Sequence, residues 1–278
     1  MDSLPTDLSN MPIYYSNSEK ELLQGTCDIL NKISYKKLEI KTDYDLICEQ
    51  IPQFESRFTL ERFCFCICIA SSRIFGFEID GKKTGGFVPF ADMINHKRPK
   101  QVIWSFNNKK NGFQIEAIDD LPKNSELYDS YGKKCNSRFL LNYGFVEDDN
   151  DANEISFKLS LDENDPLYHE KQIFFPDIEC LEMKRTYRFS QDYDDAKILG
   201  SFGFLRFYNI DNQTDFNLLN AFIADNFESN LNFIPEYTPP LSIGNETKVL
   251  NMLERLCQKQ LDGYPTTISV CIFFLFIN

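Results

Sequence analysis

The sequence predicts an α+β fold, with helical segments on both sides of a short region of strands. Apolar residues recur at helical spacing in residues 19–38 and 58–75, and residues 190–261 have the pattern of several further helices. Residues 104–118 instead alternate apolar and polar side chains around two asparagine-containing turns, which is typical of a hairpin. With 278 residues, 42% of them hydrophobic, the chain can fill the core of one large domain or two ordinary ones.

Turn residues mark the limits of the shorter elements in the first half of the chain. Gly81 and the glycine pair at 85–86 bracket a turn after the second helix, and residues 119–124 form another turn. Residues 137–142 are expected to form a short helix, which an acidic loop at 147–151 follows.

The second half begins with a strand and is otherwise helical. Alternation in residues 155–159 predicts the strand, and helical periodicity predicts helices at 218–227 and 248–261. The sequence contains no long linker rich in Pro or Ser between the two halves. We therefore place the domain boundary near residue 155, with domains over residues 1–155 and 156–278.

The net charge of −13 limits the classes of partner. Binding to phosphate backbones requires basic patches, so the composition argues against nucleic acid. An acidic surface fits two readings, namely simple solvation or contact with a basic protein or peptide.

Cysteine usage and the chain ends bear on cellular location. Nine cysteines occur, none in a Cys-x-x-Cys pair, and residues 1–20 lack the pattern of a signal peptide. We expect reduced thiols, no zinc site, and a cytoplasmic or nuclear protein. The apolar run at 270–277 is too short to span a bilayer, which takes about 20 residues, so no membrane association is expected.

Two blocks of mixed polar and aromatic residues stand out from ordinary core patterns. The first is FVPFADMINH, residues 87–96, and the second is ELYDSYGKKCNSRFLLNYGFVEDDN, residues 126–150. Both place hydrogen-bonding side chains directly beside apolar ones. Because buried polar groups cost free energy unless they are paired, such blocks indicate a ligand site or a tight internal network.

These blocks resemble the second half of the SET domain in the Rubisco large-subunit methyltransferase-like branch. Residues 8–33 are similar to the inserted helical segment of that branch, and residues 245–267 are similar to its helical substrate-binding domain. The resemblance implies a partial SET domain with an inserted helical segment, followed by a mostly α-helical substrate-binding domain. It also implies transfer of a methyl group from S-adenosyl-L-methionine to a protein side chain, usually lysine.

The resemblance assigns roles to eight residues. Tyr131 matches the catalytic tyrosine whose hydroxyl points at the transferring methyl group. Six residues match cofactor-binding positions: Arg73, Asp92, Asn95, His96, Tyr143 and Phe145. Tyr143 also matches the acceptor pocket, together with Phe75. No metal is implied.

Phe75 bears on the choice of acceptor. In relatives that methylate histidine, the position aligned with Phe75 carries a polar amide, so phenylalanine favours lysine. We expect the substrate to be a protein lysine in a basic context and the chain to act as a monomer. A protein-histidine methyltransferase remains an alternative.

Both ends differ from the family pattern. The β-rich first half of the SET domain, which carries a glycine-containing cofactor turn, has no counterpart before residue 1, and the family's acidic helical ending is replaced by the apolar run. We therefore expect a chain truncated at both ends, with an open cofactor cleft and weak cofactor binding. This leaves two other hypotheses, a catalytically inactive protein-binding module and a helical interaction protein related only by descent.

Overall fold

The computed structural model describes two compact units. The described residues are 4–25, 29–159, 161–174, 185–190, 196–228 and 234–265. Backbone contacts assign residues 1–20 and 29–148 to the first unit and residues 21–28 and 149–278 to the second. The domain boundary near residue 155 stays a prediction.

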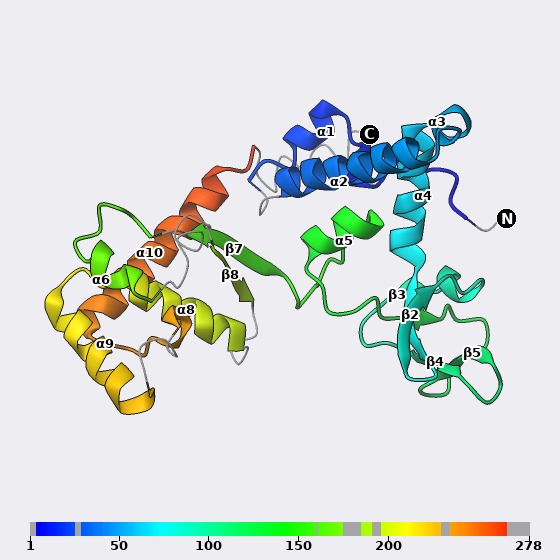
Figure 1. Cartoon of the computed structure of the whole chain (residues 1–278). Helices are drawn as coiled ribbons and strands as arrows, with labels where there is room; N and C mark the ends of the chain where they lie inside the picture. Colours follow the sequence, from blue (N-terminus) through cyan, green and yellow to red (C-terminus); the bar gives the residue numbers. More distant parts are fainter. Residues whose placement is uncertain are drawn as a thin grey trace. The chain divides into compact units, whose positions relative to one another are not determined.

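Helices at the start of the first unit supply most of its apolar core. They are η1 (Pro12–Tyr14), α1 (Asn17–Glu21), α2 (Ile29–Gln50), α3 (Phe54–Arg57) and α4 (Leu60–Arg73), shown in blue to cyan in Figure 1. The core joins three segments through Leu8, Met11, Ile13, Ile40, Cys68 and Ile69. The apolar stripe of α4 thus holds the N-terminal segment and α2 in place.

Of the two helices predicted in this unit, one is confirmed and one is corrected. The pattern at 58–75 corresponds to α4, whose start is capped by the Thr59 side chain accepting the Arg62 N–H. The continuous helix predicted over 19–38 is wrong, because α1 ends at Glu21 and α2 begins at Ile29. Gly25 lies between them with a positive φ of 83°, a conformation that interrupts a helix and favours glycine.

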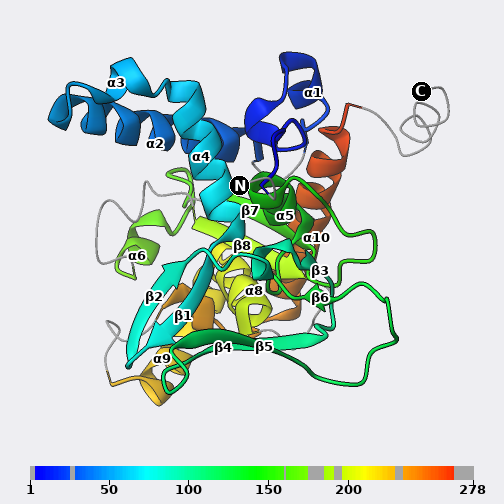
Figure 2. The same cartoon turned by 90° about the vertical axis from the view of Figure 1, so that its right-hand side faces the viewer.

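Two antiparallel hairpins follow α4. The first pairs β1 (Phe75–Ile79) with β2 (Lys82–Gly86), and the second pairs β4 (Val102–Asn107) with β5 (Gly112–Ala117). Figure 2 shows the hairpins side by side, and their aromatic rings pack together, with 5.2 Å between the ring centroids of Phe75 and Trp104. The predicted hairpin at 104–118 is confirmed. The predicted turn is narrower than expected, since Gly85 and Gly86 belong to β2.

A short parallel pair brings the two sequence blocks together. β3 (Asn95–His96) lies beside β6 (Tyr128–Asp129), with Asn95 opposite Tyr128 and His96 opposite Asp129. The predicted short helix is confirmed as α5 (Asn136–Tyr143). It ends at Gly144 with φ at +78°, where an added Cβ would lie 2.6 Å from the Asn10 amide nitrogen. This position therefore requires glycine.

The second unit combines a two-stranded sheet with helices. β7 (Glu154–Leu159) pairs with β8 (Arg185–Ser190), and the helices are α6 (Tyr168–Gln172), α8 (Ala196–Tyr208), α9 (Gln213–Asn226), η4 (Pro235–Tyr237) and α10 (Ile243–Asp262). The predicted strand and helices are present. α9 and α10 begin earlier than predicted because Asn212 and Ser242 cap their first turns.

Two kinds of feature are absent from the described part of the chain. No helix there is long and apolar enough to cross a membrane. Likewise, no group of three or more His, Cys, Asp or Glu residues is arranged to hold a metal ion in those same ranges. The apolar run at 270–277 lies outside the described residues.

Candidate functional site

A cavity of about 400 Å³ in the first unit gathers most of the predicted site residues. Its walls come from the N-terminal segment, the end of α4, the first sequence block and the second block. Seven predicted residues line it: Arg73, Asp92, Asn95, His96, Tyr131, Tyr143 and Phe145. Residues from positions 73 to 145 of the sequence thus meet around one space.

A second cavity of about 330 Å³ shares a wall with the first. Phe75, the eighth predicted residue, lines this second cavity together with Trp104. The shared wall consists of five residues that line both spaces: Ser72, Arg73, Asp92, Tyr131 and Tyr143. Two neighbouring cavities separated by aromatic and charged side chains suit a reaction between two bound groups.

The arginine of this wall is fixed by the first sequence block. Arg73 Nη1 donates to the Asp92 main-chain oxygen at 2.9 Å and to its carboxylate Oδ2 at 3.2 Å. The Asp92 side chain is 8% exposed, so the ion pair is largely shielded from water. Because Arg73 bonds two oxygens of Asp92, it positions the turn Ala91–Met93 (η2) against the end of α4.

Tyr131 is held at both its backbone and its hydroxyl. Its N–H donates to His96 Nδ1 at 2.9 Å, and its hydroxyl donates to the Ile94 main-chain oxygen at 2.7 Å. Its ring centroid lies 5.1 Å from that of Tyr143. Burial raises the pKa of Tyr131, with a smaller opposing effect from the Arg73 charge. The phenol is therefore neutral at physiological pH and faces the inside of the unit.

His96 has a defined proton arrangement. Because Nδ1 accepts from the Tyr131 backbone, the network assigns the proton of the neutral ring to Nε2. Nε2 lies 3.5 Å from Glu147 Oε1, yet among the described residues it is buried without a hydrogen-bond partner. The 3.5 Å separation from Glu147 exceeds the roughly 2.7–3.2 Å of an N–H···O hydrogen bond, so this contact is electrostatic only. An unsatisfied buried N–H is available to a ligand acceptor.

The titration of His96 should couple to the position of Tyr131. Burial lowers the pKa of His96, and the Glu147 charge opposes this in part. A lowered pKa in the folded state means that the unfolded chain binds more protons, so the free energy of unfolding falls as pH drops below about 6.5. Protonated His96 also presents an N–H to the Tyr131 N–H, and that hydrogen bond is lost.

A measurement on the two histidines of the chain tests this prediction. In an NMR titration, the His96 ring resonances should titrate below the value for a free histidine, and the Tyr131 amide resonance should shift in parallel. His169→Asn in the second unit is the matched control, because it removes the other imidazole resonance. A Tyr131 amide that stays unchanged through the His96 titration would contradict the coupling.

The Asn95 side chain contacts an acidic residue that the sequence did not single out. Its amide donates to Glu126 Oε1 at 2.6 Å, while the Tyr128 hydroxyl donates to the other carboxylate oxygen at 2.7 Å. The carboxylate of Glu126 therefore orients the amide at the edge of the cavity. The cofactor contact implied for Asn95 stays a prediction.

Sequence reasoning missed three further residues around the site. Phe139 is fully buried and packs its ring 4.6 Å from that of His96. Lys134 lines the second cavity, donates to the Tyr131 main-chain oxygen and lies 5.9 Å from the Tyr143 ring centroid. Burial lowers the pKa of Lys134. Glu147 was predicted only as part of an acidic loop, and no pattern in the sequence marks it as the neighbour of His96.

Comparisons with known proteins agree with the predicted family resemblance. A family model described as Rubisco LSMT substrate-binding matches residues 162–270. The chain is 25% identical over 285 residues to the chloroplastic fructose-bisphosphate aldolase-lysine N-methyltransferase of Arabidopsis thaliana, covering 97% of this chain and 56% of that protein. It is 23% identical over 285 residues to the actin-histidine N-methyltransferase of Otolemur garnettii, covering 99% and 47%.

The fold also matches a solved structure. Rubisco LSMT bound to AdoMet aligns with a TM-score of 0.67 and 23% identity, covering 96% of this chain and 60% of that one. This confirms the predicted α+β fold and the resemblance to LSMT-like methyltransferases. The chain spans about half the length of the curated relatives described above.

Proposed function

We propose that this chain carries the methyl-transfer centre of a protein-lysine N-methyltransferase that uses S-adenosyl-L-methionine. The observation that carries the proposal is the wall between the two cavities, which contains Tyr131, Tyr143 and the Arg73–Asp92 pair. One cavity would hold the methyl donor and the other the acceptor side chain. Positioning the two reactants next to each other accounts for much of the decrease in activation free energy that such a reaction needs.

The chemistry of the first cavity fits the donor. When bound, S-adenosyl-L-methionine supplies an electrophilic methyl group on a positively charged sulfur. Aromatic rings of Tyr131, Tyr143 and Phe145 attract such a cation, and the Nε2–H of His96 offers a donor to a ligand acceptor. A volume of about 400 Å³ lies in the range of small-molecule sites.

The second cavity suits a lysine acceptor. A lysine has an ordinary pKa of about 10.4, and desolvation favours its neutral, nucleophilic form. The rings of Phe75, Trp104 and Tyr143 provide apolar walls for the alkyl stem. The phenol of Tyr131 stays protonated because burial raises its pKa, so it orients the reacting groups and does not act as a base.

Lysine is proposed over histidine on the basis of Phe75. Its ring packs edge-on against Trp104 at 5.2 Å and offers no hydrogen bond to an imidazole nitrogen. The relatives include one enzyme named for lysine and one named for histidine, and a peptide assay distinguishes the two acceptors. Incubation with paired peptides that differ only in Lys or His tests it, and methyl incorporation restricted to the histidine peptide would refute the lysine assignment.

The partner is proposed to be a protein. The match of residues 162–270 to a substrate-binding family supports this, and the net charge of −13 suits a basic segment around the target lysine. We propose a monomer located in the cytoplasm or nucleus. The same match favours a second candidate, a binding module that holds its partner without transferring a methyl group.

Replacing Tyr131 with phenylalanine tests the proposed transfer. The change keeps the ring but removes the hydroxyl bonded to the Ile94 main-chain oxygen, and we expect transfer to fall about 100-fold or more, as for loss of one positioned polar group. The assay follows labelled methyl groups from S-adenosyl-L-methionine into lysate proteins. Tyr44→Phe is the matched control, because the Tyr44 hydroxyl also donates to a main-chain oxygen, that of Phe58, and Tyr44 lines neither cavity.

Two outcomes would count against the enzyme. Equal labelling by the unsubstituted chain and by Tyr131→Phe would show that the Tyr131 hydroxyl takes no part in the transfer step. Absence of labelling with every variant, at donor concentrations that saturate binding in a parallel calorimetric titration, would favour the binding module.

A further inference from the structure

Asp129 is a buried carboxylate in the second cavity, and the proposed function gives it no role. The residue is 5% exposed and lines the cavity beside Trp104 and Tyr131. Its main-chain oxygen accepts the Lys97 N–H at 2.9 Å, and β6 holds it opposite His96. The pairing of the two short strands therefore fixes the position of this carboxylate.

Only one of the two Asp129 oxygens is used within the cavity wall. Trp104 Nε1 donates to Oδ2 at 2.8 Å, which leaves Oδ1 with its full capacity to accept hydrogen bonds. An indole N–H needs one oxygen acceptor, and a neutral amide would serve it equally well. Within the described part of the chain, Asp129 forms no ion pair. Because a shielded charge costs free energy until it gains a counter-charge, this carboxylate favours a cationic ligand.

The two cations that line the same cavity bond other acceptors. Its charged and titratable groups are Arg73, Asp92, Asp129, Tyr131, Lys134 and Tyr143. Arg73 is paired with Asp92, and Lys134 donates to the Tyr131 main-chain oxygen. Burial raises the pKa of Tyr131, and the Asp129 charge adds to this, so the field of the carboxylate reaches the wall between the two cavities.

We propose that Asp129 binds the ammonium group of the acceptor lysine and selects amines that still carry an N–H, an inference that rests on the proposed function for the identity of the acceptor. A charge-assisted N–H···O⁻ bond to Oδ1 requires such a hydrogen. Unmethylated, monomethylated and dimethylated lysine have one, whereas trimethylated lysine has none. Binding as the ammonium ion precedes the loss of the proton that makes the amine nucleophilic. A fully methylated product loses the contact and should leave the cavity.

The aromatic rings beside Asp129 bind cations without this selectivity. The Trp104 ring centroid lies 5.2 Å from that of Phe75 and 5.6 Å from that of Phe113. Aromatic faces attract an alkylammonium ion whether or not it carries an N–H. Discrimination between dimethylated and trimethylated amines therefore depends on the carboxylate, and removing its charge should abolish it.

Binding of small amines tests the site without any need for transfer activity. The probes are n-butylammonium, which matches the lysine side chain, its N-methyl, N,N-dimethyl and N,N,N-trimethyl derivatives, and neutral n-butanol. Trp104 is the single tryptophan of the chain, lines the cavity and bonds Asp129, so its fluorescence reports occupancy. At about pH 7 the amines are protonated, and we expect the three ions with an N–H to bind at least about ten-fold more tightly than the trimethyl ion or butanol.

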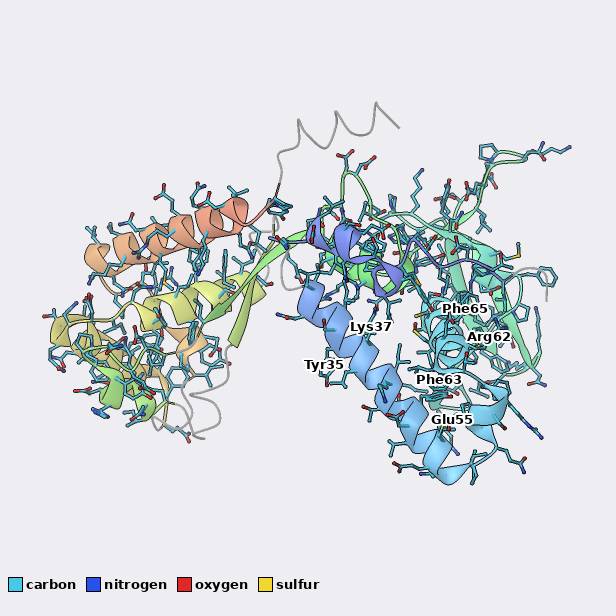
Figure 3. All side chains as sticks on the ribbon, turned by 90° about the horizontal axis from the view of Figure 1, so that it is seen from above. Tyr35, Lys37, Glu55, Arg62, Phe63 and Phe65 are labelled. Atoms are coloured by element: carbon cyan, nitrogen blue, oxygen red, sulfur yellow. The ribbon has the colours of Figure 1, made fainter. Side chains whose placement is uncertain are left out.

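A charge-removing variant separates the carboxylate from the shape of the cavity. Asp129→Asn keeps an oxygen for the Trp104 N–H, so it should weaken butylammonium binding about ten-fold or more and bring the affinities of the probes together. Glu55→Gln is the matched control, because Glu55, labelled in α3 in Figure 3, is exposed and lines neither cavity. The titrations of the unsubstituted chain decide the matter even where urea unfolding shows that Asp129→Asn does not fold.

Three results would overturn the proposal. They are equal binding of butanol and butylammonium, a preference against the trimethyl ion that persists in Asp129→Asn and so arises from size, and no saturable response of Trp104 fluorescence to any amine. Failure of the proposed function gives a different pattern. A chain that binds the amines as expected but transfers no methyl group has the ammonium site without the enzyme, whereas transfer combined with equal affinities refutes only the role of Asp129.

Discussion

Replacing Phe139 with alanine is expected to lower the free energy of unfolding of the first unit by about 3–5 kcal/mol. The Phe139 side chain is fully buried in α5, and its ring lies 4.6 Å from His96 and 5.1 Å from Phe145, measured between centroids. Removing it leaves a cavity directly behind two residues of the candidate site. The loss combines the transfer free energy of the ring with the lost packing around it.

The single tryptophan of the chain makes this measurable for one unit alone. Trp104 lies in the first unit, so its fluorescence during urea unfolding follows that unit. Phe87→Ala is a suitable control, since Phe87 is 54% exposed and its loss should cost little. A Phe139→Ala transition within experimental error of the control would show that the ring does not support the site.

The Phe139 prediction depends on a packing that the sequence did not reveal. The sequence predicts the helix over 137–142, but its pattern does not say which ring faces His96. That contact arises because β3 and β6 pair in parallel, which sets His96 opposite Asp129 and brings α5 behind the ring. The order of the two blocks along the sequence was enough to predict that their residues lie at one site, because each block contains its own turns and strands.

Other features of the site and fold could not be predicted from the sequence for a different reason. The contacts of His96 with Glu147 and of Asn95 with Glu126 join side chains far apart in the sequence, and neither glutamate belongs to a periodic pattern. The break between α1 and α2 follows from the conformation of Gly25, which one sequence does not reveal. Charged partners and glycine conformations are decided by tertiary packing, whereas helix and hairpin patterns are local.

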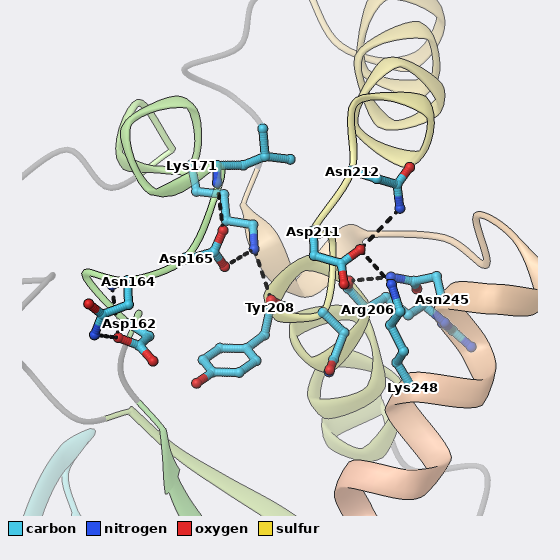
Figure 4. Close-up of polar contacts among 12 residues, drawn as sticks. Asp162, Asn164, Asp165, Lys171, Arg206, Tyr208, Asp211, Asn212, Asn245 and Lys248 are labelled. Atoms are coloured by element: carbon cyan, nitrogen blue, oxygen red, sulfur yellow. Dashed lines mark hydrogen bonds and ion pairs between the residues drawn. The ribbon is translucent and has the colours of Figure 1, made fainter.

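The second large effect concerns a buried ion pair in the second unit, drawn in Figure 4. Lys171 Nζ lies 2.5 Å from Asp165 Oδ2 and donates to the Tyr208 main-chain oxygen at 2.9 Å. The Lys171 side chain is 0% exposed. We expect Asp165→Asn to destabilise the unit by about 3–5 kcal/mol, because it leaves a buried ammonium without its counter-charge. Asparagine keeps the oxygen that accepts the Leu167 N–H, so the loss reports the charge.

An exposed pair of the same length provides the matched control. Lys248 Nζ also lies 2.5 Å from its partner, Asp211 Oδ1, but the two side chains are 40% and 47% exposed. Asp211→Asn should therefore cost no more than about 1 kcal/mol. Far-UV circular dichroism during urea unfolding measures both, and Trp104 fluorescence reports whether the first unit unfolds separately. Equal losses for the two variants would show that burial does not set the energy of the Lys171 pair.

A double substitution separates the value of the pair from the cost of a stranded charge. Adding Lys171→Met to Asp165→Asn removes the ammonium that the first change leaves uncompensated, and a methionine side chain can fill much of the same apolar space. The double variant should be more stable than Asp165→Asn alone, because a buried ion pair replaced by apolar groups is often close to neutral. If both variants lose the same stability, the stranded ammonium is not the source of the loss, and the energy lies in the Lys171–Asp165 pair itself.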